Sequence, residues 1–313
     1  MISFSACSRF TNPSQITKTR SISSEISPTT MVTILSFPPE LKEKLICKYK
    51  VDNEGGFSLF LTDLDTGIIR QLTIEDDSSP KWSPDGEQIA FVSWRDGNSN
   101  IYIMNSDGSA QQKLTDDPGY DAQIDWSPDG NRIAYISDRD GNLEIYTLNL
   151  STRETRRLTF NNNDEGEPVW SSDGKKIAFV SSVQGDSFEI YIMDSDGRNI
   201  KQITPSGSGN FARPVWCPGN HCLIYENEVY GKYQKYQRLF VYNFDTGEER
   251  RLFSEFSTST ESTHEWYASL SKGNQYILFW LLDSEQDLMY AFDMEKNLYY
   301  SLGVKGGECD LYP

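Results

Sequence analysis

The chain has 313 residues, of which 37% are hydrophobic and 13% aromatic, so it can bury a large core. It carries 46 acidic and 29 basic residues, for a formal charge of −17. Nucleic acids and anionic membranes are bound by Lys and Arg, so this charge excludes both as expected partners. No stretch approaches the ~20 apolar residues that a membrane-spanning helix needs.

The N-terminal segment differs in composition from the rest of the chain. Residues 1–30 are rich in Ser and Thr and contain a single acid, Glu25. This composition is typical of an organelle transit peptide, of a disordered tail, or of a segment upstream of a true start at Met31. An apolar secretory region is absent, so classical export is not expected. We expect residues 1–36 to be flexible and residues 37–313 to form the folded domain.

The cysteines predict a reducing compartment. There are five of them, namely Cys7, Cys47, Cys217, Cys222 and Cys309. They are too few and too scattered for a disulfide framework. The sequence therefore predicts a cytoplasmic protein, or an organellar one if residues 1–30 are a transit peptide. Cys217 and Cys222 flank a four-residue turn and could face each other, but a disulfide is not expected there without an oxidising compartment.

The first predicted strands lie around residues 45–47, 59–61 and 70–73, with no good inner strand before them. A repeat follows, in which the pattern P-x-W-S-P-D-G places Trp82, Trp126 and Trp170 at a step of 44 residues. A degenerate copy of the repeat contains Trp216. Such a repeated Trp is predicted to pack in the core between neighbouring units.

Each copy of the repeat contains further short apolar runs. They lie at 89–93, 133–137, 177–181 and 223–226, and again at 101–104, 145–148, 190–193, 239–242 and 289–292. Their length predicts strands, and a Leu-Thr or similar pair at the end of each unit predicts its fourth strand. Pro, Asp and Gly between the runs predict tight turns. Four strands in a period of about 40–45 residues predict a β-propeller.

Counting the units predicts six blades. Four units begin near residues 74, 116, 160 and 205, and a worn one begins near 253. Residues 310–313 match residues 77–80, so the C-terminus can supply the missing inner strand of the first blade. We therefore predict an all-β, six-bladed propeller of four-stranded antiparallel blades, its ring closed by pairing of the N- and C-terminal segments. Residues 32–37 are the alternative for the same position.

The repeat resembles the WD-repeat-like propeller repeats of the TolB family, over roughly residues 44–313. The resemblance implies the fold, whereas function varies among proteins with this repeat. TolB itself has an export signal and a separate N-terminal α/β domain, which are not found here. A Tol-system role in the periplasm is therefore not expected.

Catalytic motifs are scarce. There is no G-x-S-x-G nucleophile motif, and the two histidines, His221 and His264, fall in different blades. No cofactor is expected apart from a possible calcium ion. The alternating oxygen ligands that suggest it are Asp138, Asp140, Asn142 and Glu144. A plain hairpin turn is the favoured interpretation of this segment.

Aligning the inner strands predicts a ring of side chains around one mouth of the channel. Its members are Asp77, Asp121, Glu165, Phe211, His264 and Asp310. An acidic ring would bind a cation or a basic peptide. The alternative is that each acid caps its own blade by accepting bonds from nearby backbone N–H groups. For His264, a solvated loop position is the favoured alternative to a ligand.

An insertion breaks the fourth repeat and adds three tyrosines and three basic residues. These are Tyr230, Lys232, Tyr233, Lys235, Tyr236 and Arg238. Tyr and Arg are enriched at protein contact sites, so the segment is a candidate partner-contact loop, and a long solvated hairpin is the alternative.

The sequence predicts a non-catalytic binding module that engages a protein or a peptide, possibly basic, through the propeller face and channel mouth. A metal-dependent hydrolase or lyase with its site in the central channel is the alternative. A subunit of a larger assembly is a third hypothesis.

Overall fold

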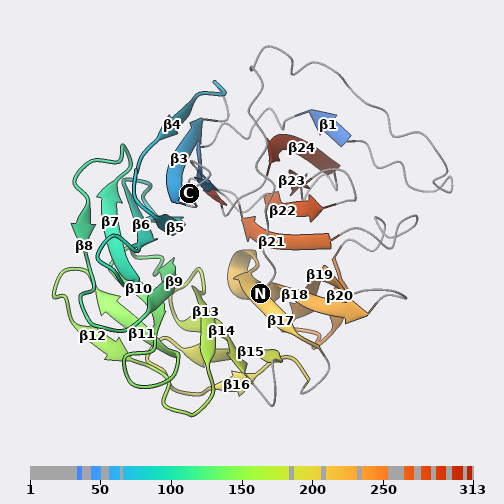
Figure 1. Cartoon of the computed structure of the whole chain (residues 1–313). Helices are drawn as coiled ribbons and strands as arrows, with labels where there is room; N and C mark the ends of the chain where they lie inside the picture. Colours follow the sequence, from blue (N-terminus) through green and yellow to red (C-terminus); the bar gives the residue numbers. More distant parts are fainter. Residues whose placement is uncertain are drawn as a thin grey trace.

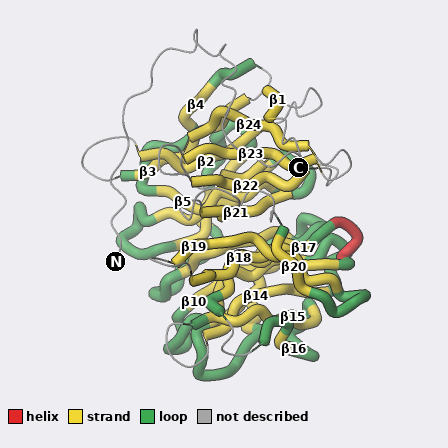
Figure 2. The backbone as a smooth tube through the Cα atoms, turned by 90° about the vertical axis from the view of Figure 1, so that its right-hand side faces the viewer, coloured by secondary structure: helices red, strands yellow, loops and turns green. Residues whose placement is uncertain are grey.

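The fold was obtained as a computed structural model. It describes residues 34–36, 44–50, 56–63, 66–182, 187–205, 209–230, 235–252, 264–270, 276–282, 287–293, 298–305 and 309–311. The described strands form six sheets, arranged radially around a common centre in Figure 1 and stacked side by side in Figure 2. Within this part of the chain, no helix combines the length and apolar character needed to cross a bilayer.

Three sheets follow the clear repeats, and each is named here by its innermost strand. The β5 sheet contains β5 (Asp77–Trp82), β6 (Gln88–Ser93), β7 (Asn100–Asn105) and β8 (Gln112–Lys113). The β9 sheet contains β9 (Asp121–Trp126), β10 (Arg132–Ser137), β11 (Glu144–Asn149) and β12 (Thr155–Arg157). The β13 sheet contains β13 (Glu165–Trp170), β14 (Lys176–Ser182), β15 (Phe188–Asp194) and β16 (Lys201–Gln202).

The other three sheets contain the worn repeats. The β17 sheet contains β17 (Phe211–Trp216), β18 (Cys222–Tyr230), β19 (Lys235–Asn243) and β20 (Glu249–Arg251). The β21 sheet contains β21 (His264–Leu270), β22 (Tyr276–Leu282), β23 (Asp287–Asp293) and β24 (Leu298–Lys305). The β25 sheet contains β25 (Cys309–Leu311), β2 (Lys44–Lys50), β3 (Phe57–Asp63) and β4 (Ile69–Gln71). The predicted all-β propeller of four-stranded antiparallel blades is confirmed.

The second strand of each clear repeat is buried on both faces, as its apolar run predicts. In β10, Ile133, Ala134 and Tyr135 are fully buried. The turn that precedes this strand places Gly130 at φ 70°, a conformation that residues with a side chain resist. Asp129 holds the same turn by accepting hydrogen bonds from the Ser127 hydroxyl and the Asn131 N–H.

The repeated tryptophans pack between neighbouring sheets, as predicted. Trp82, Trp126, Trp170 and Trp216 are each 5–6% exposed. The indole N–H of Trp126 donates to the Lys81 carbonyl of the preceding sheet at 3.2 Å. All four side chains therefore fix one sheet against the next by apolar burial, and Trp126 and Trp216 add an indole hydrogen bond to the preceding sheet.

The first and last described strands lie in different sheets. Residues 309–311 pair antiparallel with β2, so that Leu311 opposes Leu45 and Cys309 opposes Cys47. Strand β1 (Ile34–Ser36) instead adds to the outer edge of the β21 sheet, parallel to β24. The alternative that residues 32–37 supply the inner strand of the first blade is therefore wrong. The rest of the segment 1–36 lies outside the described residues, so its predicted flexibility stays a prediction.

Candidate functional site

The candidate site lies on the face where the innermost strands begin, which we call the entry face. Asp77, Asp121 and Glu165 are the first residues of β5, β9 and β13. Each opposes the last part of its neighbouring strand, as Asp77 opposes Ser93. The loops that follow those neighbouring strands therefore meet the starts of the inner strands on this face.

In the β5 sheet, the inner-strand acid is part of a buried ion pair. Arg95 Nη2 lies 3.2 Å from both carboxylate oxygens of Asp77, whose side chain is fully buried. The guanidinium also donates to Ser93 at 2.6 Å and lies 4.6 Å from the centre of the Tyr102 ring. The charge of Asp77 is therefore neutralised within its own sheet.

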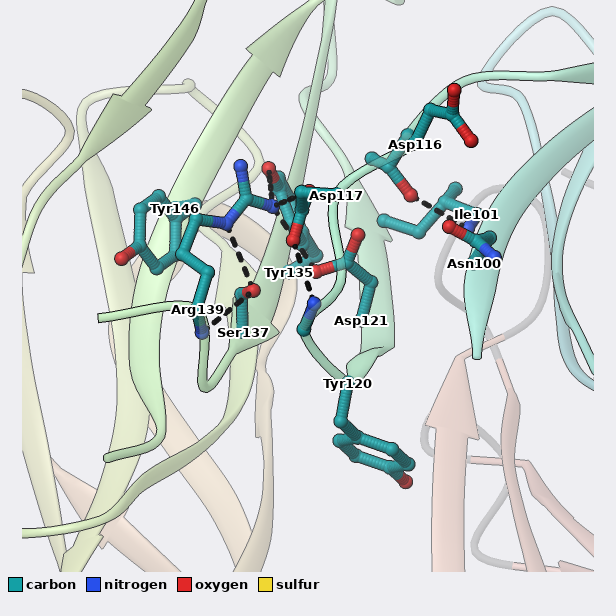
Figure 3. Close-up of polar contacts among 12 residues, drawn as sticks. Asn100, Ile101, Asp116, Asp117, Tyr120, Asp121, Tyr135, Ser137, Arg139 and Tyr146 are labelled. Carbon is teal, nitrogen blue, oxygen red and sulfur yellow. Dashed lines mark hydrogen bonds and ion pairs between the residues drawn. The ribbon is translucent and has the colours of Figure 1, made fainter. Parts of the chain in front are cut away.

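The β9 sheet repeats this arrangement, drawn in Figure 3. Arg139 Nη2 lies 3.0 Å from Asp121 and 2.7 Å from Asp117, and the guanidinium Nε donates to Ser137 at 2.9 Å. Asp121 is fully buried, and its burial raises the pKa of its carboxyl group. Tyr120 points away from this cluster in Figure 3.

The β13 sheet lacks the arginine, because the sequence has Val183 at the corresponding position. Glu165, 1% exposed, instead accepts hydrogen bonds from Asn161 Nδ2 at 2.5 Å and Ser181 Oγ at 3.2 Å. Its Oε2 atom has no hydrogen-bond partner among the described residues. Burial, with a further contribution from the negative charge of Glu144, raises the pKa of Glu165 to about 7.

In the β17 sheet, the inner-strand position holds Phe211, which is 2% exposed and packs its ring against Tyr225. An ion pair is still present nearby, since Arg213 Nη1 lies 2.7 Å from Glu226 Oε2. The predicted channel-mouth residues of four consecutive sheets are thus buried. Ligand binding by these residues themselves stays a prediction.

The register corrects two members of the predicted ring. In β21, the residue equivalent to Asp77 is Glu265, because Glu265 opposes Leu281 as Asp77 opposes Ser93. His264 lies one residue before that position. The error arose because this repeat has Leu270 where the others have the marker tryptophan.

Asp310 is also out of register with Asp77. Asp310 opposes Ile46, which corresponds to the pairing of Lys81 with Ala90 further along β5. The sequence match between residues 310–313 and 77–80 is therefore misleading. In the structure Leu311, opposite Leu45, takes the apolar position that Trp82 takes opposite Ile89. The side chains of His264 and Asp310 lie outside the described part of the structure.

Several oxygen atoms of the calcium candidate are engaged by protein groups, although Glu144 Oε2 has no hydrogen-bond partner among the described residues. Asp138 accepts the Tyr120 N–H at 2.7 Å, and Asp140 accepts the Tyr146 hydroxyl at 2.5 Å. Glu144 pairs with Arg157 at 2.7 Å. Asn142 donates from its amide to Glu144 at 3.2 Å. Across the described ranges, no group of three or more His, Cys, Asp or Glu side chains is suited to hold a metal.

The insertion lengthens the hairpin of β18 and β19, in which Tyr230 opposes Lys235. Residues 231–234, which include Lys232 and Tyr233, lie outside the described residues. Tyr236 is 4% and Arg238 6% exposed, and the guanidinium lies 4.9 Å from the tyrosine ring centre. Tyr236 and Arg238 are therefore buried in the sheet. The prediction that they form part of an exposed contact loop is wrong.

The exposed groups of the entry face include aromatic and apolar side chains. Trp94 and Tyr120 are 43% and 38% exposed, and their ring centres lie 5.7 Å apart across the boundary between two sheets. Ile74 and Phe160, at equivalent positions after the Leu-Thr pairs, are 85% and 74% exposed. Sequence reasoning missed this set because each residue falls in a loop between predicted strands.

A second feature missed in the sequence is a bulge in each of four inner strands. Ser79, Gln123, Glu167 and Arg213 all have φ near 50°. Gln123 Oε1 accepts the N–H of Glu167 at 2.7 Å, and Glu167 in turn accepts the N–H of Arg213. Left-handed residues other than glycine are uncommon and persist where their surroundings hold them. The bulge side chains therefore link one inner strand to the next.

The sequence model of the TolB beta propeller domain family matches residues 47–264 of this chain. The chain belongs to the TolB β-propeller domain family. The resemblance stated from the repeat is thereby confirmed.

Individual relatives of this TolB-type propeller match over short segments. The Tol-Pal system protein TolB of Thioalkalivibrio sulfidiphilus is 36% identical over 69 residues, which are 20% of this chain and 16% of that protein. The chain thus spans a small part of the curated relatives that it matches.

Solved structures match over most of the TolB-type propeller. TolB from Acinetobacter baumannii has a TM-score of 0.71 at 21% identity, covering 88% of this chain and 68% of that one. An oligogalacturonate lyase in complex with manganese has a TM-score of 0.59 at 19% identity, covering 82% and 72%. At these identities the likeness shows the fold alone.

Proposed function

We propose that the chain is a non-catalytic binding module that engages a basic protein segment through its entry face. The observation that carries this proposal is the exposed set Ile74, Trp94, Tyr120 and Phe160 on one face of an acidic disc. Exposed aromatic groups on a rigid scaffold are typical of protein contact sites. One relative is itself a protein of the Tol-Pal system, which supports a protein partner.

The charge of the entry face favours a basic partner. Its arginines, Arg95 and Arg139, are held by the buried carboxylates of Asp77 and Asp121. Acids remain exposed beside them, namely Glu75, Asp76, Asp116, Asp138 and Asp164. With a whole-chain charge of −17, this surface attracts Lys- and Arg-rich segments and repels acidic ones. In this proposal the buried inner-strand acids support the surface and the exposed residues contact the partner.

The proposal is tested with peptides selected by phage display on the full chain. A selected peptide is synthesised, and its Kd is measured for the wild type and for a Trp94→Ala, Phe160→Ala double variant. We expect the double variant to lose about tenfold or more in affinity, because exposed aromatic anchors contribute on the order of 1 kcal/mol or more each.

The matched control changes exposed apolar residues on the opposite face. Ile68 and Ile200 lie in the hairpin turns there and are 64% and 48% exposed. An Ile68→Ala, Ile200→Ala variant is expected to bind as the wild type does. Equal losses in the two double variants, or selection of acidic rather than basic peptides, would contradict the proposal.

We also propose that the six sheets are six blades of one closed ring. The pairing of β25 with β2 and the adjacency of the sheets support this. Closure would pack the first sheet against the last, so that only the short outer edges of the sheets stay free. Limited proteolysis in the presence of a reductant tests it, because an open ring would release the β25 segment well before the other sheets are cut.

The alternative of a metal-dependent hydrolase or lyase has no supporting cluster among the described residues. His221 is exposed and lies 3.3 Å from Asp245, on the side away from the entry face. Metal analysis of protein purified without chelator tests this alternative, and a stoichiometric ion would favour it over the binding module.

A further inference from the structure

Two separate places in the described chain hold disulfide-bonded cysteines. Cys217 and Cys222 are joined across the turn between β17 and β18. Cys47, in β2, is also disulfide-bonded and is fully buried. Because the chain has five cysteines, the partner of Cys47 is either Cys7 or Cys309.

The strand register decides between these two. Cys309 lies in β25 directly opposite Cys47 in β2. Directly opposed residues of antiparallel strands have Cα atoms about 4.5–5.5 Å apart, within the range of about 4.4–6.8 Å that a disulfide requires. We infer that a disulfide joins Cys47 to Cys309 and covalently fastens the C-terminal strand to the first blade.

The position of this bond gives it a specific consequence. Strand β25 has three residues, and each of them pairs with a residue of β2. A bond between Cys47 and Cys309 closes a loop that contains nearly all of the described chain. Constraining so long a loop restricts the unfolded chain strongly.

The bond also bears on the compartment. Its formation removes two protons and two electrons from the two thiols, and a disulfide-containing oxidant accepts them as it is reduced to two thiols. Such oxidants maintain structural disulfides in the periplasm, in the endoplasmic reticulum and outside the cell. The two bonded sites therefore oppose the cytoplasmic location expected from the sequence and favour an oxidising compartment such as the periplasm.

Peptide mapping tests the pairing directly. The full chain is produced by secretion, its free thiols are blocked with N-ethylmaleimide, and it is digested without reductant. We expect a reductant-sensitive peptide pair that contains Cys47 and Cys309. A link between Cys47 and Cys7, or a blocked thiol at Cys309, would overturn the inference, and this readout does not depend on any variant folding.

Thermal unfolding supplies the second readout. Cys47→Ser, Cys309→Ser and the double variant are each expected to lower the Tm by the same amount, about 10 °C, because each removes one and the same bond. The matched control, Cys217→Ser with Cys222→Ser, opens only a short loop and is expected to lower the Tm less. A double variant that loses the sum of the two single effects would show that the cysteines are not bonded to each other.

Discussion

Arg95 contacts both carboxylate oxygens of Asp77, each at 3.2 Å, from a loop 18 residues further along the chain. The acid is fully buried and the guanidinium side chain is 19% exposed. The pair joins the start of the innermost strand to the turn after the second strand. The inner-strand acid thus holds the sheet together, and the groups open to a ligand are its neighbours.

Asp77→Asn is expected to destabilise the protein by about 2–4 kcal/mol, because it leaves Arg95 partly buried without its carboxylate. Urea unfolding measures the change. Asp116→Asn is the matched control, since its side chain is 87% exposed, and it is expected to have little effect. If Asp77→Asn leaves the urea midpoint unchanged, Asp77 does not stabilise the fold and is again a candidate ligand-binding residue.

Glu165→Gln is expected to change the pH dependence of stability. The folded pKa of about 7 lies above the ordinary value of 4.5, so the folded state binds more protons than the unfolded state between these values. Wild-type stability should therefore fall as pH rises from about 4.5 to 7, by up to about 3 kcal/mol.

The glutamine variant removes this loss, because its side chain stays neutral at every pH. Thermal unfolding at pH 5 and pH 8 should show the variant near the wild type at pH 5 and more stable at pH 8. Glu154→Gln, at an exposed position, is the control. A variant less stable than the wild type at pH 8 would show that the Glu165 carboxylate is favourable in the folded protein.

Thr159 is expected to be needed for its hydroxyl rather than for its shape. It is fully buried, and its Oγ1 accepts the N–H of Ile145 at 2.9 Å. Thr159→Val keeps the volume but leaves that N–H without its acceptor, at a cost of about 1–3 kcal/mol. Thr159→Ser keeps the acceptor and is expected to cost less. Urea unfolding of the two variants checks this order, and a valine variant as stable as the serine variant would contradict it.

Binding of the selected basic peptide is expected to depend on salt. The exposed acids Glu75, Asp76 and Asp164 attract it through solvent, where screening acts within about 10 Å at 0.1 M salt. Raising the salt from 0.05 to 0.5 M should weaken the affinity several-fold, chiefly through slower association. Anisotropy titrations and stopped-flow measurements check both points. A salt-independent Kd would mean that the aromatic groups act without the acids.

The fold could be predicted from the sequence because the same local signals recur. The step that separates Trp82, Trp126 and Trp170 fixes the strands and turns of three sheets at once. Where the marker was lost, the register was misjudged: Leu270 replaces the tryptophan of β21, and the error moved His264 into the place of Glu265. The inner strand β25 was found, but its pairing with β2 depends on Cys309 and Leu311 rather than on Asp310.

The site was harder to predict, because composition does not reveal which charges neutralise each other. Asp77 and Asp121 lie at the starts of β5 and β9, yet their partners, Arg95 and Arg139, lie in turns that the sequence marks only as Asp-Gly loops. The exposure of Trp94 and Tyr120 depends on how two sheets meet. Such contacts between sheets leave no periodic pattern.

The pairing of β25 with β2 has a mechanical consequence. The chain enters β2 and leaves β25 at the same end of this two-stranded ladder, beside the Leu45 and Leu311 pair. A force that pulls Lys44 and Leu311 apart therefore opens the ladder one residue pair at a time, starting with Leu45 and Leu311. The opening would proceed until it reached Cys47 and Cys309, where a covalent bond would transfer the tension to the backbone of the disc.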